Sequence, residues 1–145
     1  MHVLAFAPSL RAVLDEAGGV TADGFPLTSC HVASFPAQIT VPIVLAVYTQ
    51  GGSDHDPRRY IVARSPEQER ISTLECAWHW PDKPGVPVKF WVTTCNLPMV
   101  VQTAGVYTVG LYDTPDGTET EHLFPLPLAK TNPFAAAPPQ PTTRM

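Results

Sequence analysis

Three successive segments between Val86 and Leu128 constrain the fold more than any other part of the chain. The segments 86–95, 104–112 and 118–128 are rich in apolar residues, and each has the length of a β-strand. Residues 113–117 between the last two segments supply Asp and Gly, which tight turns favour. The stretch therefore predicts consecutive strands that run back and forth in a sheet.

Alternation along these segments also predicts which side chains are buried, because side chains alternate across a strand. By this rule Trp91 and its neighbours Lys89 and Thr93 face away from the core. Segment 71–80 alternates in the same way. The residues predicted to face the core are Val86, Val88, Phe90, Val92, Tyr107, Val109 and Leu111, together with Leu74, Cys76, Trp78 and Trp80.

Seventeen prolines and nine glycines are spread along the chain and argue against a helical protein. About eight or nine short strands separated by turn signals predict an antiparallel β-sandwich, immunoglobulin-like in broad architecture. One segment, 9–16, departs from this pattern. Ser9 as an N-cap and the spacing of Leu10, Val13 and Leu14 predict a short helix there.

The chain is expected to form one domain followed by a tail. Its 145 residues suit a single hydrophobic core, which we place in residues 1–130. Residues 131–145 are proline-rich without periodicity, which indicates an extended, polyproline-like segment. The tail residues predicted to contact a neighbouring subunit are Pro133, Phe134, Pro138 and Pro139.

Charge and cysteine content exclude several classes of protein. The net charge is −4 and there is no basic run, so a nucleic-acid partner is not expected. No apolar run approaches the roughly 18 residues of a membrane span, and the start lacks the features of a signal peptide. The odd number of cysteines (Cys30, Cys76 and Cys95) favours a reducing compartment, although one pair could bridge two strands.

Two clusters contain residue types that carry chemistry. Cys76 and His79 have a spacing seen in metal sites, but residues three apart on a strand point to opposite faces, so no metal is predicted. The loop 53–56 holds two carboxylates and one imidazole, too few ligands for calcium, and a solvated turn is favoured. It is the best place for an acid/base pair, but no nucleophile motif accompanies it. No catalytic, metal or cofactor site is therefore predicted.

Short motifs give the chain a resemblance to known sequences. These are Asn96-Leu97, the Gly105-Val-Tyr107 segment and the Leu126-Pro-Leu128 segment, with Gly18-Gly19 and Pro42 in the first half. With them the chain resembles a family of uncharacterised small β-sandwich domains found in bacteria and their phages. The resemblance covers roughly residues 2–130 and not the tail. It implies a sandwich fold, no assigned activity and no catalytic residues.

These observations favour a non-enzymatic structural or interaction protein. The charged fraction is 15%, below the roughly 25% usual for soluble domains, and Trp91 is an outward anchor for a protein contact. We expect a phage virion component, either a capsid decoration or a tail accessory subunit, whose tail contacts a neighbouring subunit. Its location would be the virion, or the cytoplasm if no phage encodes it.

Two alternatives stay open. A carbohydrate- or ligand-binding module would use Trp91 and loop residues near 54–56, because aromatic faces stack on apolar surfaces. A small hydrolase or metal enzyme would use the same loop.

Overall fold

The computed structural model describes residues 1–50, 56–81 and 84–132. These residues form ten β-strands, against the eight or nine predicted, and no helix. Accordingly, no helix in the described ranges is long and apolar enough to cross a membrane. The strands are β1 (His2–Pro8), β2 (Arg11–Leu14), β3 (Val20–Asp23), β4 (Cys30–Val32), β5 (Ala37–Gln50), β6 (Arg58–Arg64), β7 (Arg70–Ala77), β8 (Val88–Val101), β9 (Gly105–Tyr112) and β10 (His122–Lys130).

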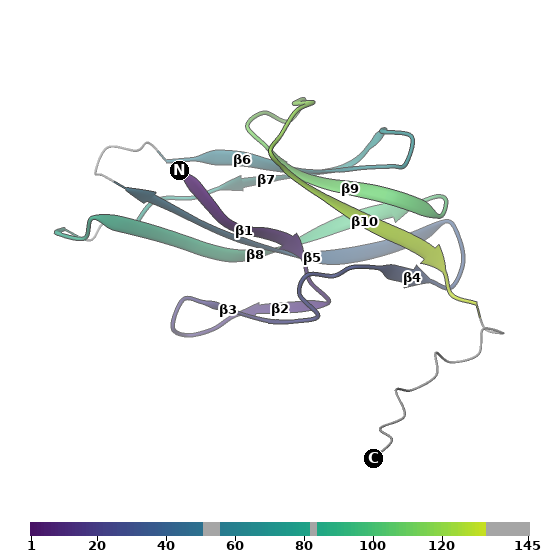
Figure 1. Ribbon diagram of the computed structural model, residues 1–145, viewed down its shortest axis with the longest axis horizontal. Helices are drawn as coiled ribbons and strands as arrows, with labels where there is room; N and C mark the ends of the chain where they lie inside the picture. The colour runs from purple at the N-terminus through teal and green to yellow at the C-terminus, as the bar shows by residue number, and fades with distance from the viewer. Residues whose placement is uncertain (51–55, 82–83, 133–145) are drawn as a thin grey trace, which may run out of the picture.

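The strands form two larger sheets and one hairpin, which confirms an all-β, sandwich-like fold (Figure 1). One sheet has the order β1-β5-β8, the other has the order β4-β10-β9-β6-β7, and β2 pairs with β3. All pairs are antiparallel except β4, which runs parallel to β10. The prediction of a purely antiparallel fold is therefore wrong at this one strand.

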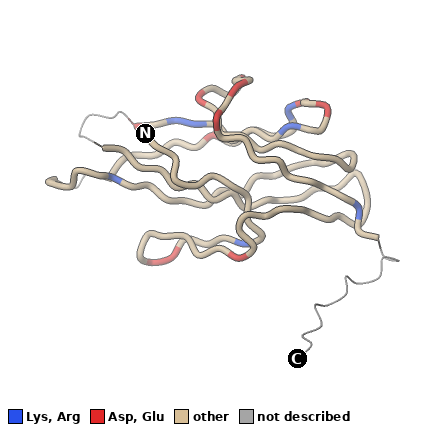
Figure 2. Tube along the Cα trace, in the orientation of Figure 1, with Lys and Arg blue, Asp and Glu red and all other residues tan. Residues whose placement is uncertain are grey.

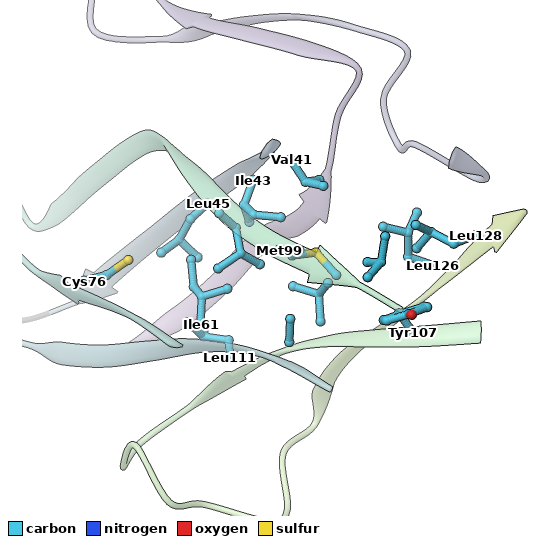
Figure 3. Packing of buried hydrophobic residues seen from close by; sticks show 14 of the residues in the cluster. Val41, Ile43, Leu45, Ile61, Cys76, Met99, Tyr107, Leu111, Leu126 and Leu128 are labelled. Atoms are coloured by element: carbon cyan, nitrogen blue, oxygen red, sulfur yellow. The ribbon is translucent and has the colours of Figure 1, made fainter. Parts of the chain in front are cut away.

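The core lies between the two larger sheets, as Figure 3 shows for side chains that point toward one another from both layers. Tyr107, Val109 and Leu111 are buried, as the alternation predicted. Each large apolar side chain removed from water stabilises the fold by about 1.5–3 kcal/mol. Residues from the two sheets that meet in this core include Ile43, Leu45, Val47, Leu97, Met99, Ile61, Ala63, Leu126 and Leu128.

The orientation predicted for residues 86–95 is wrong. Phe90 is 53% exposed and Val86 is 43% exposed, whereas Trp91 packs against the core. The reason is the length of β8, which continues to Val101 and pairs along its whole length with β5. Its second half buries the odd-numbered residues, and a regular strand keeps the same alternation along its first half.

The helix predicted over 9–16 is also wrong, because the chain forms the β2–β3 hairpin there. The amide of Asp15 donates to the Gly19 carbonyl at 2.8 Å, and the Gly19 amide donates to Oδ1 of Asp15 at 2.9 Å. Gly18 between them has φ of +88°, a conformation that glycine adopts without strain. An eight-residue helix would be marginal by itself, so these turn contacts decide the local structure.

Candidate functional site

The sheet β1-β5-β8 has almost no charge. Its strands contain 7, 14 and 14 residues, and Lys89 is the single Asp, Glu, Lys or Arg among them. Figure 2 shows β1 and β5 without charged residues, while acidic residues gather in the surrounding loops. One side of this sheet covers the core. We call the opposite side, which carries Phe90, the outer face.

Three aromatic rings lie side by side across the outer face, one from each strand. His2 of β1 is the register partner of Tyr48 of β5, and Tyr48 is the partner of Phe90 of β8. The rings of His2 and Tyr48 are stacked with centroids 4.8 Å apart, and those of Tyr48 and Phe90 are tilted at 5.8 Å. Such cross-strand aromatic contacts stabilise a sheet. We call these three residues the aromatic row.

The aromatic row is open to solvent. His2 and Phe90 are exposed and Tyr48 is half-buried, and Leu4 of β1 is a further exposed apolar residue. Exposed apolar groups of this kind on a sheet with a single charged residue are typical of a surface that binds another molecule. The row is therefore the best candidate for a functional site in the described part of the chain.

The β2–β3 hairpin packs against β5 and β8 and is fixed by Ser9. The fully buried Ser9 donates its amide to the Pro42 carbonyl of β5 at 2.8 Å. Its hydroxyl oxygen lies 2.7 Å from the Arg11 carbonyl oxygen and 2.8 Å from that of Asp23. The hairpin exposes Val13 and also the charged residues Arg11 and Asp23, so it borders the outer face with a mixed surface.

Trp91, the predicted outward anchor, lies on the core side of β8. Its ring stacks on Trp78 with centroids 4.5 Å apart and an angle of 5° between the planes. Trp78 in turn contacts Trp80 edge-on at 5.7 Å, and both of these residues are buried as predicted. That Trp91 contacts a partner stays a prediction. The predicted tail contacts at Pro133, Phe134, Pro138 and Pro139 lie outside the described residues.

Asp56 and His79 form the one interaction seen at the predicted acid/base loop, whose residues 53–55 lie outside the described ranges. Nδ1 of His79 is 2.7 Å from Oδ1 of Asp56. The side chain of His79 is 76% exposed and that of Asp56 is 61% exposed. Bulk water therefore reaches the pair, whereas a closed active site expels water. Among the described residues, no group of three or more His, Cys, Asp or Glu could hold a metal ion.

An open cleft of about 540 Å³ lies at the end of the sandwich that carries the N-terminus. Met1 and His122 are among its lining residues, together with Arg59 and Asp113. Nε of Arg59 is 3.2 Å from Oδ1 of Asp113, so this cation is already paired with a carboxylate of the same chain. The cleft shows that the starts of β1 and β10 are neighbours, which matters for the position of the tail.

Sequence reasoning missed the aromatic row because His2, Tyr48 and Phe90 are far apart in the chain. The alternation of exposed Asn96 and Pro98 with buried Leu97 was the signal that would have placed Phe90 outward. No signal in the sequence predicted which residues of β1 and β5 lie beside it, since that depends on strand register.

No protein family model, curated protein or solved structure matches this chain. The resemblance to small β-sandwich domains of bacteria and phages therefore stays a prediction.

Proposed function

We propose that this chain is a non-enzymatic interaction protein that builds a larger assembly through its outer face. The observation that carries the proposal is the exposed aromatic row on strands that contain one charged residue, Lys89. The cores of protein interfaces are enriched in aromatic residues and depleted of charged ones. This surface chemistry suits a protein partner better than it suits a charged ligand.

The partner segment that we propose is the tail, residues 131–145, of a neighbouring copy. The tail contains Pro133, Pro138, Pro139 and Pro141, and proline-rich segments dock on aromatic surfaces as stiff, extended chains. Each copy then supplies one aromatic row and one tail, and the tail of each copy occupies the row of the next.

The ends of the domain are arranged in a way that suits contact between copies. His122, the first residue of β10, lines the same cleft as Met1, next to the row residue His2. From there β10 runs to Lys130, and nine residues of strand span about 27 Å. The tail therefore starts at the end opposite to the row, which suits head-to-tail assembly (Figure 1).

Two finer proposals accompany this one. The first is an immunoglobulin-like architecture. Its support is the Tyr107 hydroxyl, which donates to the Thr103 carbonyl at 2.7 Å in a contact that resembles the tyrosine corner of such domains.

The second proposal is that the assembly is a phage virion, with the chain as a capsid decoration or tail accessory subunit. Its support is the low charged fraction and a contact that can repeat. Mass spectrometry of purified particles should detect the chain, and particles that lack it would overturn this second proposal.

Light scattering during gel filtration tests the head-to-tail contact on the full chain. We expect the average mass to rise with protein concentration up to about 100 μM, a range that reveals micromolar contacts. Phe90→Asp, which puts a charge into the row, and a chain ending at residue 130 should both stay monomeric. The matched control is Leu123→Asp, since Leu123 is 52% exposed on the outer side of the other sheet.

Three results would contradict the proposal. These are a monomeric wild type throughout, association that survives loss of the tail, or equal effects of Phe90→Asp and Leu123→Asp. A monomer that binds a glycan array through Phe90 would instead favour the carbohydrate-binding alternative, because sugars also stack on aromatic rings.

A further inference from the structure

Cys76 and Cys95 lie on two edge strands that meet along one side of the sandwich. β7 is the last strand of the five-stranded sheet, β8 is the last strand of the three-stranded sheet, and the two pack against each other. The Sγ atoms of Cys76 and Cys95 are 3.6 Å apart. The stack of Trp78 on Trp91 is a second contact between the same two strand regions. The two thiols are therefore held close together by the packing of β7 of one sheet against β8 of the other.

We propose that Cys76 and Cys95 form a disulfide bond that joins the two sheets when the chain meets a disulfide oxidant such as oxidised glutathione. Bonded sulfurs are about 2.05 Å apart, so the two atoms have to approach by about 1.5 Å. We expect side-chain rotation to provide most of this movement. The proposed bond is a covalent modification and is independent of the proposed assembly function.

The two thiols have different environments that assign them different roles. The hydrogen bond with Cys95, followed by burial, raises the pKa of the buried Cys76 thiol. The same hydrogen bond lowers the pKa of Cys95, which is only half-buried. A thiolate is the attacking species in thiol–disulfide exchange. Cys76 is 5% exposed whereas Cys95 is partly open to solvent, so a dissolved oxidant reaches Cys95 first. Cys95 is therefore the first nucleophile, and Cys76 is the thiol that completes the bond.

The disulfide forms in two successive steps of thiol–disulfide exchange. The Cys95 thiolate attacks one sulfur of oxidised glutathione, forms a mixed disulfide and releases one glutathione thiolate, which takes up a proton. Cys76 then loses its proton to solvent and attacks the Cys95 sulfur, which releases the second glutathione. Two protein thiols are oxidised to one disulfide, and one glutathione disulfide is reduced to two thiols. In a reducing compartment the pair stays as thiols.

The bond would stabilise the fold because it ties together residues that are 19 positions apart. Closing a loop of this length restricts the unfolded chain. For a domain of this size we expect the oxidised form to melt roughly 5–10 °C above the reduced form. Cys30 has no place in this pair, so it stays a free thiol in the oxidised chain.

The test uses the full wild-type chain, equilibrated with oxidised glutathione and then denatured and alkylated. The number of alkylated thiols should fall from three to one. Before alkylation, the intact mass of the oxidised chain should be about 2 Da below that of the reduced chain, for the two hydrogens lost. Peptide mapping of the unreduced digest should show Cys76 joined to Cys95. This measurement needs no variant, so it does not depend on whether a substituted chain folds.

The matched control is Cys30→Ser, which should form the same bond and show the same rise in melting temperature. Cys95→Ser should show neither. Three alkylated thiols in wild type after oxidation, a bond that involves Cys30, or stable mixed glutathione adducts on both Cys76 and Cys95 would each overturn the proposal.

Discussion

Gly110 lies beneath the ring of Tyr112, two residues further along β9. A Cβ atom at Gly110 would lie 2.5 Å from Cε2 of this ring, closer than two such atoms can approach. The ring is fixed, because Tyr112 is buried and the Arg64 guanidinium lies 5.9 Å from its centroid. Arg64 also donates to the Gly117 carbonyl at 2.9 Å, which holds the turn after β9 over the same site.

Gly110→Ala should lower the free energy of unfolding by about 1–3 kcal/mol, because the added methyl displaces the Tyr112 ring. Urea denaturation followed by fluorescence measures this change. The control is the same substitution in a Tyr112→Ala background, where the methyl finds space and should cost much less. An equal cost in both backgrounds would show that the ring is not the cause.

At this scale the sequence predicted burial along β9 but not close contacts. Tyr107, Val109 and Leu111 were placed correctly because alternation along one strand is a local property. The space requirement at Gly110 was not predictable, since it depends on the rotamer that Tyr112 adopts under residues from another strand.

At the scale of elements, β8 shows how a strand's length fixes its faces. Val88, Phe90 and Val92 alternate with Lys89, Trp91 and Thr93, so the pattern of this segment alone favours the wrong face for the core. Ending the strand at residue 95 removed the alternation around Leu97 that separates the two faces. A shift of one residue exchanges all side chains between core and surface, which is why Trp91 and Phe90 were interchanged.

Trp91→Ala and Phe90→Ala should therefore differ strongly in stability. Removing the Trp91 ring takes away its stack on Trp78 and leaves a cavity, with an expected loss of about 3–5 kcal/mol. Phe90→Ala removes a half-exposed ring and should cost less than about 1.5 kcal/mol. Chemical denaturation of the two variants under identical conditions measures the difference. A larger loss of stability for Phe90→Ala would instead indicate that Phe90, and not Trp91, faces the core.

At the scale of the whole molecule, the all-β class followed from local signals, while the site did not. Seventeen prolines and the turn residues argue against a mainly helical protein without any knowledge of tertiary structure. The aromatic row and the Cys76–Cys95 pair depend on which strands become neighbours and in which register. Alternation in a single sequence contains no information on these long-range pairings.

Association of whole molecules through the outer face should resist salt, because β1, β5 and β8 contain a single charged residue, Lys89, and its alternation with Phe90 puts it on the opposite side of the sheet. Each copy carries a net charge of −4, so salt also screens the repulsion between copies. We expect the association constant to stay level or rise up to about threefold between roughly 0.05 and 0.5 M NaCl, as the Debye length shortens. Sedimentation velocity at several protein concentrations measures this constant. A contact that depended on ion pairs would weaken over the same range, and such a loss would place the interface on the charged loops instead of the aromatic row.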